Sequence, residues 1–344
     1  IDAKDFKFSQ NLEKFIVKEV TNDERYKNKN IALYGDPNLK INLDKVLSLV
    51  KKSPNLTLNF PSYIDAYQGF RLLFNQIYID IDHYKNRYLI SKDPEDLHQF
   101  RVSLRKTRSI LKIAKELYNP EILTEILENF KVVAKSTNQR RDFDVFIEYL
   151  EGIEGSKDAV ESLKFVINKQ IYGPEEMLNC LKYKMFFLDY DGFLADSEAF
   201  YRDKKIAIKP FVAKLIRTQI VEVEKKVIKL SAESLNSEFH QTRIELKRLR
   251  YLLESFASMF ELKAINTFFK TVKEVQDLFG ELQDRDVWCS IIDMYDKGDA
   301  GEFLKAQKSK ISIDMFEIRR EILDDKRKFM SQAMRVSRVL KVYY

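Results

Sequence analysis

Apolar residues recur along most of the chain at the three- and four-residue spacing of an α-helix. Glycine and proline are scarce, with nine and seven copies, and neither occurs between Phe211 and Phe279. This pattern predicts an all-α protein. Asp93 and Asn119 stand where they can cap helices, directly before two of the five prolines that precede apolar-periodic runs: Pro61, Pro94, Pro120, Pro174 and Pro210.

The predicted helices fall into two series. The first comprises residues 62–90, 95–118, 121–139, 142–151, 157–170 and 175–197. The second comprises residues 211–233, 237–260, 263–283, 284–296 and 299–335. Residues 1–60 are more mixed and carry turn signals at 35–37 and 53–55. They predict a small N-terminal appendage of helix and short strands, to which the sequence assigns no role.

An internal repeat explains the two series. A twelve-residue segment that starts at His98 recurs 142 residues later, starting at His240. Both copies read H-x2-R-x3-[RK]-[KR]-x-R, and they hold two of the three histidines of the chain. The same offset keeps matching residues downstream without a gap. We therefore predict two copies of one folded unit, at residues 61–200 and 201–344.

Charge is concentrated in the repeated segment. The net charge is only +6, from 59 basic and 53 acidic residues, but six basic residues and no acidic one lie between His98 and Lys115. Helical spacing places one stripe of side chains at His98, Arg101, Arg105, Arg108 and Lys112. Apolar residues flank this stripe on both sides, which predicts a groove between packed elements. Crowded guanidinium groups repel one another, so a polyanionic ligand would stabilise them.

Cysteine usage and hydropathy indicate the redox compartment and the absence of a membrane-spanning segment. Cys180 and Cys289 belong to no C-x-x-C pair or zinc-like cluster, which favours a reducing compartment. The richest apolar run, residues 185–188, ends at Asp189 and is too short to span a membrane. We expect a cytoplasmic protein with no membrane segment and no cofactor. The sequence favours no particular oligomeric state.

The repeated motif and the segments that follow it resemble the CHAD domain, the conserved histidine α-helical domain, over residues 61–335. The second copy continues with Gly-Glu-Leu-Gln-Asp-Arg-Asp-Val at 280–287, and the first with Asn-Gln-Arg-Arg-Asp-Phe-Asp-Val at 138–145. The resemblance implies two helical bundles related by pseudo-twofold symmetry, with basic helices lining a central cavity. It also implies binding of inorganic polyphosphate and association with polyphosphate granules. We expect this binding to be non-enzymatic, because the conspicuous residues are nearly all cationic and no carboxylate cluster lies among them.

The resemblance carries over to individual positions. It assigns polyphosphate binding to His98, Arg101, Arg105, Lys106, Arg108, His240, Arg243, Lys247, Arg248 and Arg250. We add Lys112 from the basic stripe, and Lys131 and Lys273 from the next helix of each copy. The copies differ in charge, since Lys112 corresponds to Glu254 and Lys135 to Asp277. The first half is therefore expected to hold a polyanion more tightly.

Two other functions stay open. A metal-dependent phosphohydrolase would use one histidine as acid or base and hold Mg²⁺ through the motif aspartates, Asp142, Asp144, Asp284 and Asp286. We favour these aspartates instead as caps of the next helix that also orient neighbouring basic side chains. A nucleic-acid-binding protein would also need a basic stripe, but few aromatic residues interleave with this one.

Two further motifs are discounted. Residues 189–192 read D-x-D-G, as in the nucleophile loop of haloacid-dehalogenase-type phosphatases. Residues 222–226 fit E-x-E-x-K, the signature of tunnel triphosphatases. Both fall within predicted helices, and the strand patterns that accompany these motifs in the two enzyme classes are not found around them.

Overall fold

The computed structural model describes residues 29–32, 56–60, 64–170, 174–195, 206–260, 262–295 and 300–344. Helices dominate these residues, which confirms the all-α prediction. Two short strands, β1 (Lys29–Ala32) and β2 (Leu56–Asn59), pair in parallel. The rest of the predicted appendage at 1–60 lies outside the described residues, apart from Phe60. None of the described helices combines the length and apolarity needed to cross a membrane.

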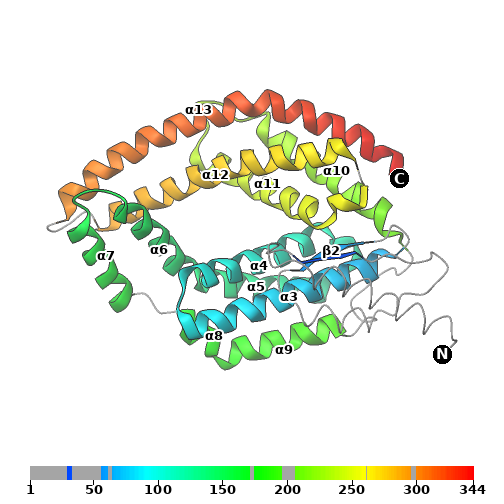
Figure 1. Ribbon diagram of the computed structural model, residues 1–344, viewed down its shortest axis with the longest axis horizontal. Helices are drawn as coiled ribbons and strands as arrows, with labels where there is room; N and C mark the ends of the chain where they lie inside the picture. Colours follow the sequence, from blue (N-terminus) through cyan, green and yellow to red (C-terminus); the bar gives the residue numbers. More distant parts are fainter. Residues whose placement is uncertain are drawn as a thin grey trace.

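The helices form two layers (Figure 1). The first layer contains α3 (Ala66–Ser91), α4 (Pro94–Ile113), α5 (Pro120–Ser136), α8 (Pro174–Asn179) and α9 (Leu181–Ala195). The second contains α10 (Ile208–Val227), α11 (Asn236–Phe256), α12 (Lys263–Tyr295) and α13 (Gly301–Leu340). Two more helices reach from the first layer to the ends of α12 and α13, namely α6 (Asn138–Glu151) and α7 (Lys157–Gln170). Short 3₁₀ turns lie at Lys115–Leu117, Ala257–Phe260 and Lys341–Tyr343.

Helix starts follow the sequence repeat. The starts of α3 and α10 are 142 residues apart, and so are those of α4 and α11. Both proposed caps are confirmed: the Asp93 carboxylate accepts from the Glu95 N–H at 2.9 Å, and the Asn119 side chain accepts from the Glu121 N–H at 3.0 Å. The two discounted motifs lie inside α9 and α10, as expected.

Two backbone hydrogen bonds join the halves where α3 and α10 begin. The Ala66 N–H donates to the Ile206 carbonyl at 2.7 Å, and the Ile208 N–H donates to the Ile64 carbonyl at 3.1 Å. The two bonds are equivalent under the repeat, because Ile208 corresponds to Ala66 and Ile206 corresponds to Ile64 at the offset of 142. This reciprocal form is what a local twofold axis requires. The twofold relation between the whole bundles stays a prediction.

The helix boundaries that follow α4 and α11 differ from the predicted ones. In the first half, the helix expected to run to residue 139 ends at Ser136, and α6 begins at Asn138. In the second half, the expected boundary at 283–284 is wrong, because α12 continues through it. The repeat places Thr137 opposite Phe279, which packs against Phe239 with ring centroids 5.9 Å apart. The threonine instead accepts a side-chain hydrogen bond at a break in the helix.

Two hydrophobic cores hold the helices. In the larger core, the fully buried Phe70 of α3 contacts Phe211 of α10 and Phe256 of α11, with ring centroids 5.8 and 5.1 Å apart. The smaller core joins α6 and α7 to the ends of α12 and α13. There Trp288 stacks on Tyr149 at 4.3 Å. The two halves are therefore packed together at two separate places.

We expect Phe70→Ala to lower the free energy of unfolding by about 3–5 kcal/mol, because the substitution leaves a cavity in the core that joins both halves. Urea unfolding followed by circular dichroism measures the change. The matched control is Phe316→Ala on α13, where the side chain is 65% exposed and the expected change is below about 0.5 kcal/mol. Equal effects of the two substitutions would contradict this assignment of the core.

Candidate functional site

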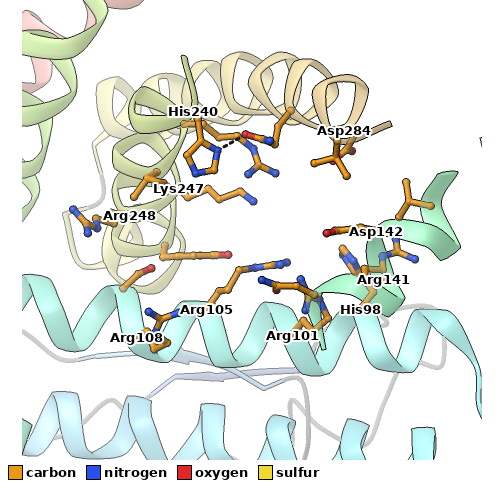
Figure 2. A pocket seen from close by; sticks show the side chains of 18 of the residues that line it. His98, Arg101, Arg105, Arg108, Arg141, Asp142, His240, Lys247, Arg248 and Asp284 are labelled. Carbon is orange, nitrogen blue, oxygen red and sulfur yellow. Dashed lines mark hydrogen bonds between the residues drawn. The ribbon is translucent and has the colours of Figure 1, made fainter. Parts of the chain in front are cut away.

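A cavity of about 550 Å³ lies between four helices, α4 and α6 of the first half and α11 and α12 of the second. Figure 2 shows its side chains directed inward from both halves. We call it the central cavity. Eight of its lining residues are Arg or Lys, two are His and two are Asp. Within the described residues, this is a strongly cationic space walled by packed helices.

Most of the predicted ligand-binding residues meet in the central cavity. Nine of them line it: His98, Arg101, Arg105, Arg108, Lys112, His240, Arg243, Lys247 and Arg248. Lys131 lines a hollow beside it. The other three, Lys106, Arg250 and Lys273, are not among the lining residues. The spacing that predicted a groove between packed elements therefore located its basic walls.

Several lining residues were not predicted as ligand contacts. They are Ser109, Asn138, Arg141, Asp142, Val145, Ile244, Tyr251, Gln283, Asp284, Val287 and Trp288. Arg141 is the main omission, since it adds a cation from α6 (Figure 2). Its position in the sequence, directly before the motif aspartate Asp142, could have identified it as a candidate contact. The corresponding residue of the second half, Gln283, hydrogen-bonds His240.

Arg101 combines a cavity position with a structural contact. It is 6% exposed, and its Nη1 donates to Thr137 Oγ1 at 2.6 Å and to the Ala134 carbonyl at 3.3 Å. The Ala134 carbonyl lies in the last turn of α5, where backbone acceptors lack intrahelical partners. Burial, followed by the charge of Arg105, lowers the pKa of Arg101 to about 9. The guanidinium thus stays charged at pH 7 while it bridges α4 to the α5–α6 break.

Two lining side chains lose charge in this environment. Burial, followed by the charges of Arg243, Arg105 and Arg250, lowers the pKa of Lys247 to about 6. Burial is also the main cause that lowers the pKa of His98 to about 4. Both groups are therefore mostly neutral at pH 7. Figure 2 shows Lys247 and Arg105 entering the same space from opposite walls, so the charge of Arg105 opposes protonation of Lys247.

Some of the basic residues have acidic partners. Lys106 forms an ion pair of 3.1 Å with Glu254 of the opposite half, which ties α4 to α11 outside the cavity. Arg248 forms an ion pair of 2.7 Å with Glu245 on its own helix. Other guanidinium groups are less satisfied. The Nε atoms of Arg105, Arg108 and Arg243 are buried and have no hydrogen-bond acceptor in the protein. Donors of this kind are costly to bury alone and suit oxygen acceptors.

The four motif aspartates divide into two pairs. Asp142 and Asp284 line the cavity; burial raises the pKa of each, while Arg101 opposes the shift at Asp142 and Arg243 opposes it at Asp284. Their expected capping role is wrong, because both lie inside helices. The expected orienting role is confirmed at Asp144, whose carboxylate accepts a hydrogen bond from Arg140 Nε at 3.0 Å.

No cluster of three or more His, Cys, Asp or Glu side chains is placed to hold a metal ion within the described part of the chain. Asp286 faces a different partner, since it accepts a hydrogen bond from Asn236. The four aspartates therefore do not converge on one point.

Comparisons with known proteins identify the fold and the family. No curated protein matches the chain. A crystal structure of the CHAD domain from the plant Ricinus communis is similar, with a TM-score of 0.68 at 17% identity, over 80% of this chain and 93% of that one. PptA from Streptomyces chartreusis is similar with a TM-score of 0.55 at 12% identity, over 79% of this chain and 99% of that one.

The family model of the CHAD domain matches residues 77–293, which contain both copies of the repeated motif and all the residues that line the central cavity. This match covers well over half of the chain. The chain belongs to the CHAD domain family.

Proposed function

We propose that the protein binds inorganic polyphosphate in the central cavity and does not cleave it. The observation that carries this proposal is the composition of the cavity, where eight Arg or Lys residues from both halves face two Asp residues. Guanidinium groups bind phosphate oxygens through paired hydrogen bonds, and ammonium groups act as point charges. A linear chain of phosphates supplies many such oxygens within a narrow width. Association with polyphosphate granules would follow from this binding.

The orphaned donors support a ligand that is rich in acceptors. The Nε atoms of Arg105, Arg108 and Arg243 have no acceptor within the protein, although they are buried. A polyphosphate chain would supply acceptors to these guanidinium groups and reduce the repulsion among the neighbouring cations at the same time. A neutral ligand would do only the first of these.

A phosphohydrolase fits these residues less well. Metal-dependent phosphoryl transfer uses carboxylates that hold Mg²⁺ against the phosphate. Here Asp142 and Asp284 line the cavity while Asp144 pairs with Arg140, so the motif carboxylates point to separate partners. Phosphate released from polyphosphate in the presence of Mg²⁺ would favour the enzyme.

A nucleic-acid ligand also fits less well. Proteins that bind single strands stack bases on exposed aromatic rings. The aromatic residues that line the cavity are Tyr251, 2% exposed, and Trp288, 7% exposed and stacked on Tyr149. Neither ring presents a free face to a base. A phosphate chain without bases needs no such face.

The double variant Arg105→Gln/Lys247→Gln should bind long-chain polyphosphate at least about tenfold more weakly, because it removes one cation from each wall. The logarithm of the binding constant should also fall less steeply with the logarithm of salt concentration, by about one unit of slope per residue removed. Isothermal titration calorimetry at several salt concentrations measures both, and analysis of the polymer afterwards tests whether it stays intact.

The matched control for this variant is Lys182→Ala/Lys184→Ala, which removes two exposed charges from α9, away from the cavity. Its affinity should stay within about twofold of the wild type. Equal losses in the two variants, or a shortened polymer, would overturn the proposal.

Binding should be coupled to proton uptake. The Lys247 pKa of about 6 leaves this amine mostly neutral at pH 7.5, and a bound polyanion would raise the pKa and add a proton. Affinity should therefore increase as the pH falls from about 8 to about 6. Calorimetry at pH 7.5 in buffers of different ionisation enthalpy detects the proton. The Lys247→Met variant is the control, because it retains any ionisation of the ligand; equal uptake in variant and wild type would refute the assignment to Lys247.

A further inference from the structure

Helix α9 is apolar on two opposite faces. The side chains of its inner face are at most 8% exposed and pack into the larger core: Tyr183, Phe186, Phe187, Tyr190 and Phe193. Its outer face carries Leu181, Met185 and Leu188, which are 72%, 54% and 70% exposed. Surface helices usually turn a polar face to solvent. Figure 1 shows α9 along the edge of the first layer that lies away from the second layer, where another molecule can reach its outer face.

The outer face of α9 has the residue spacing of a helix-pairing seam. Leu181, Met185, Leu188 and Gly192 follow one another at intervals of four, three and four residues. Two packed helices meet at positions with this alternation, the a and d positions of a heptad. On one helix these positions form a narrow stripe. The stripe therefore fits a second helix laid along α9.

Gly192 completes the stripe, and the packing of this chain does not explain it. A glycine inside a helix is less favourable than an alanine. At Gly69, an added Cβ atom would overlap the side chain of Ile208, so the fold itself requires the glycine there. At Gly192, an added Cβ atom would meet no atom within 4 Å. The close approach of a second helix would explain the missing side chain.

Charged residues flank the stripe in a regular order. Lys182 and Asp189 lie along one flank, and Lys184 and Asp191 lie along the other, at the e and g positions beside the seam. All four are exposed, and none has an ion-pair partner among the residues that the structure describes. Both lysines precede both aspartates along the helix. Turning α9 end over end therefore exchanges its positive and negative ends.

An antiparallel copy of α9 complements the stripe. A twofold axis through the middle of the stripe, between sequence positions 186 and 187, places Met185 opposite the partner's Leu188. The same axis places Leu181, the larger end of the stripe, opposite the partner's Gly192. Each contact occurs twice, because a twofold interface uses the same surface on both copies.

The same arrangement pairs every flanking charge with an opposite one. In an antiparallel pair, each flank faces the same flank of the partner. Lys182 then meets the partner's Asp189, and Lys184 meets the partner's Asp191. A parallel pair would join only Lys184 to the partner's Asp189. Charge at the e and g positions sets orientation and partner choice, so this pattern favours the antiparallel pair.

We infer that the outer face of α9 binds a second copy of this chain through antiparallel pairing of the two α9 helices. This inference is independent of the proposed function. The helix has 15 residues and is about 22 Å long, which is short for a stable interface. The dimer is therefore weak, with a dissociation constant on the order of 100 µM. The D-x-D-G sequence at 189–192 then supplies two ion pairs and the close helix contact.

Sedimentation velocity of the full chain from about 5 to 500 µM, a range that brackets this dissociation constant, measures the association. The variant Leu188→Glu places a carboxylate in the stripe and should raise the dissociation constant at least about tenfold. Leu188 is exposed, so the fold tolerates the change. The matched control is Met294→Glu on α12, an apolar residue that is 61% exposed, and its dissociation constant should stay within about twofold.

A charge exchange tests the pairing itself. Lys182→Asp/Lys184→Asp should weaken the dimer about threefold to tenfold, because each new carboxylate faces an aspartate of the partner. Adding Asp189→Lys/Asp191→Lys to the same chain reverses every pair, keeps the net charge of the wild type and should restore the dimer. These substitutions leave all residues of the central cavity in place, so the affinity of each protomer for polyphosphate is a separate measurement.

Three results would overturn the inference. The first is a wild type that stays monomeric over the whole concentration range. The second is a dimer that Leu188→Glu and Met294→Glu weaken equally, since association would then use another surface. The third is a charge exchange that weakens the dimer without restoring it when all four charges are reversed.

Discussion

Mutual repulsion among cations in a partly buried space is the constraint on which this structure depends. Eight Arg and Lys residues share a cavity with two Asp residues, and burial adds a desolvation cost to their repulsion. Such a site persists only if its walls cannot move apart. The two hydrophobic cores meet this need, because one joins α3 to α10 and α11 and the other joins α6 and α7 to α12 and α13. Of the helices that line the cavity, α4 and α11 are anchored in the first core, α6 in the second and α12 in both.

The basic residues of the repeated motif make different contacts, and not all of them add charge to the cavity. Lys106 uses its charge to pair with Glu254 across the halves, so it stabilises the wall and does not line the cavity. Arg101 both lines the cavity and donates to the Ala134 carbonyl in the last turn of α5. The uniform run of charge in the sequence is thus divided, in space, between residues that build the wall and residues that face the ligand space.

Much of the fold and most of the site could be predicted because both depend on local spacing. Helical periodicity located the helices, and the 3–4–3–4 spacing placed His98 through Lys112 on one face. Partners distant in sequence could not be predicted in this way: Glu254 is 148 residues from Lys106, and no spacing rule connects them. The break at Thr137 was expected a few residues later, at 140–141, because the hydrogen bond that Thr137 accepts comes from Arg101 on another helix. Arg141 was overlooked because it lies outside the repeated basic motif.

The difference between Arg105 and Lys247 indicates how a duplicated site can reduce its own repulsion. These two residues occupy corresponding positions of the repeat and enter the same space from opposite walls. A guanidinium group cannot lose its proton under ordinary conditions, whereas an amine can. With arginine at both positions, the empty cavity would carry both charges permanently. Lysine at 247, with its pKa lowered to about 6, is mostly uncharged at pH 7 in the empty cavity, and a bound polyanion would restore its charge. The substitution therefore limits the cost of the empty cavity without reducing the number of cations available to a bound polyanion.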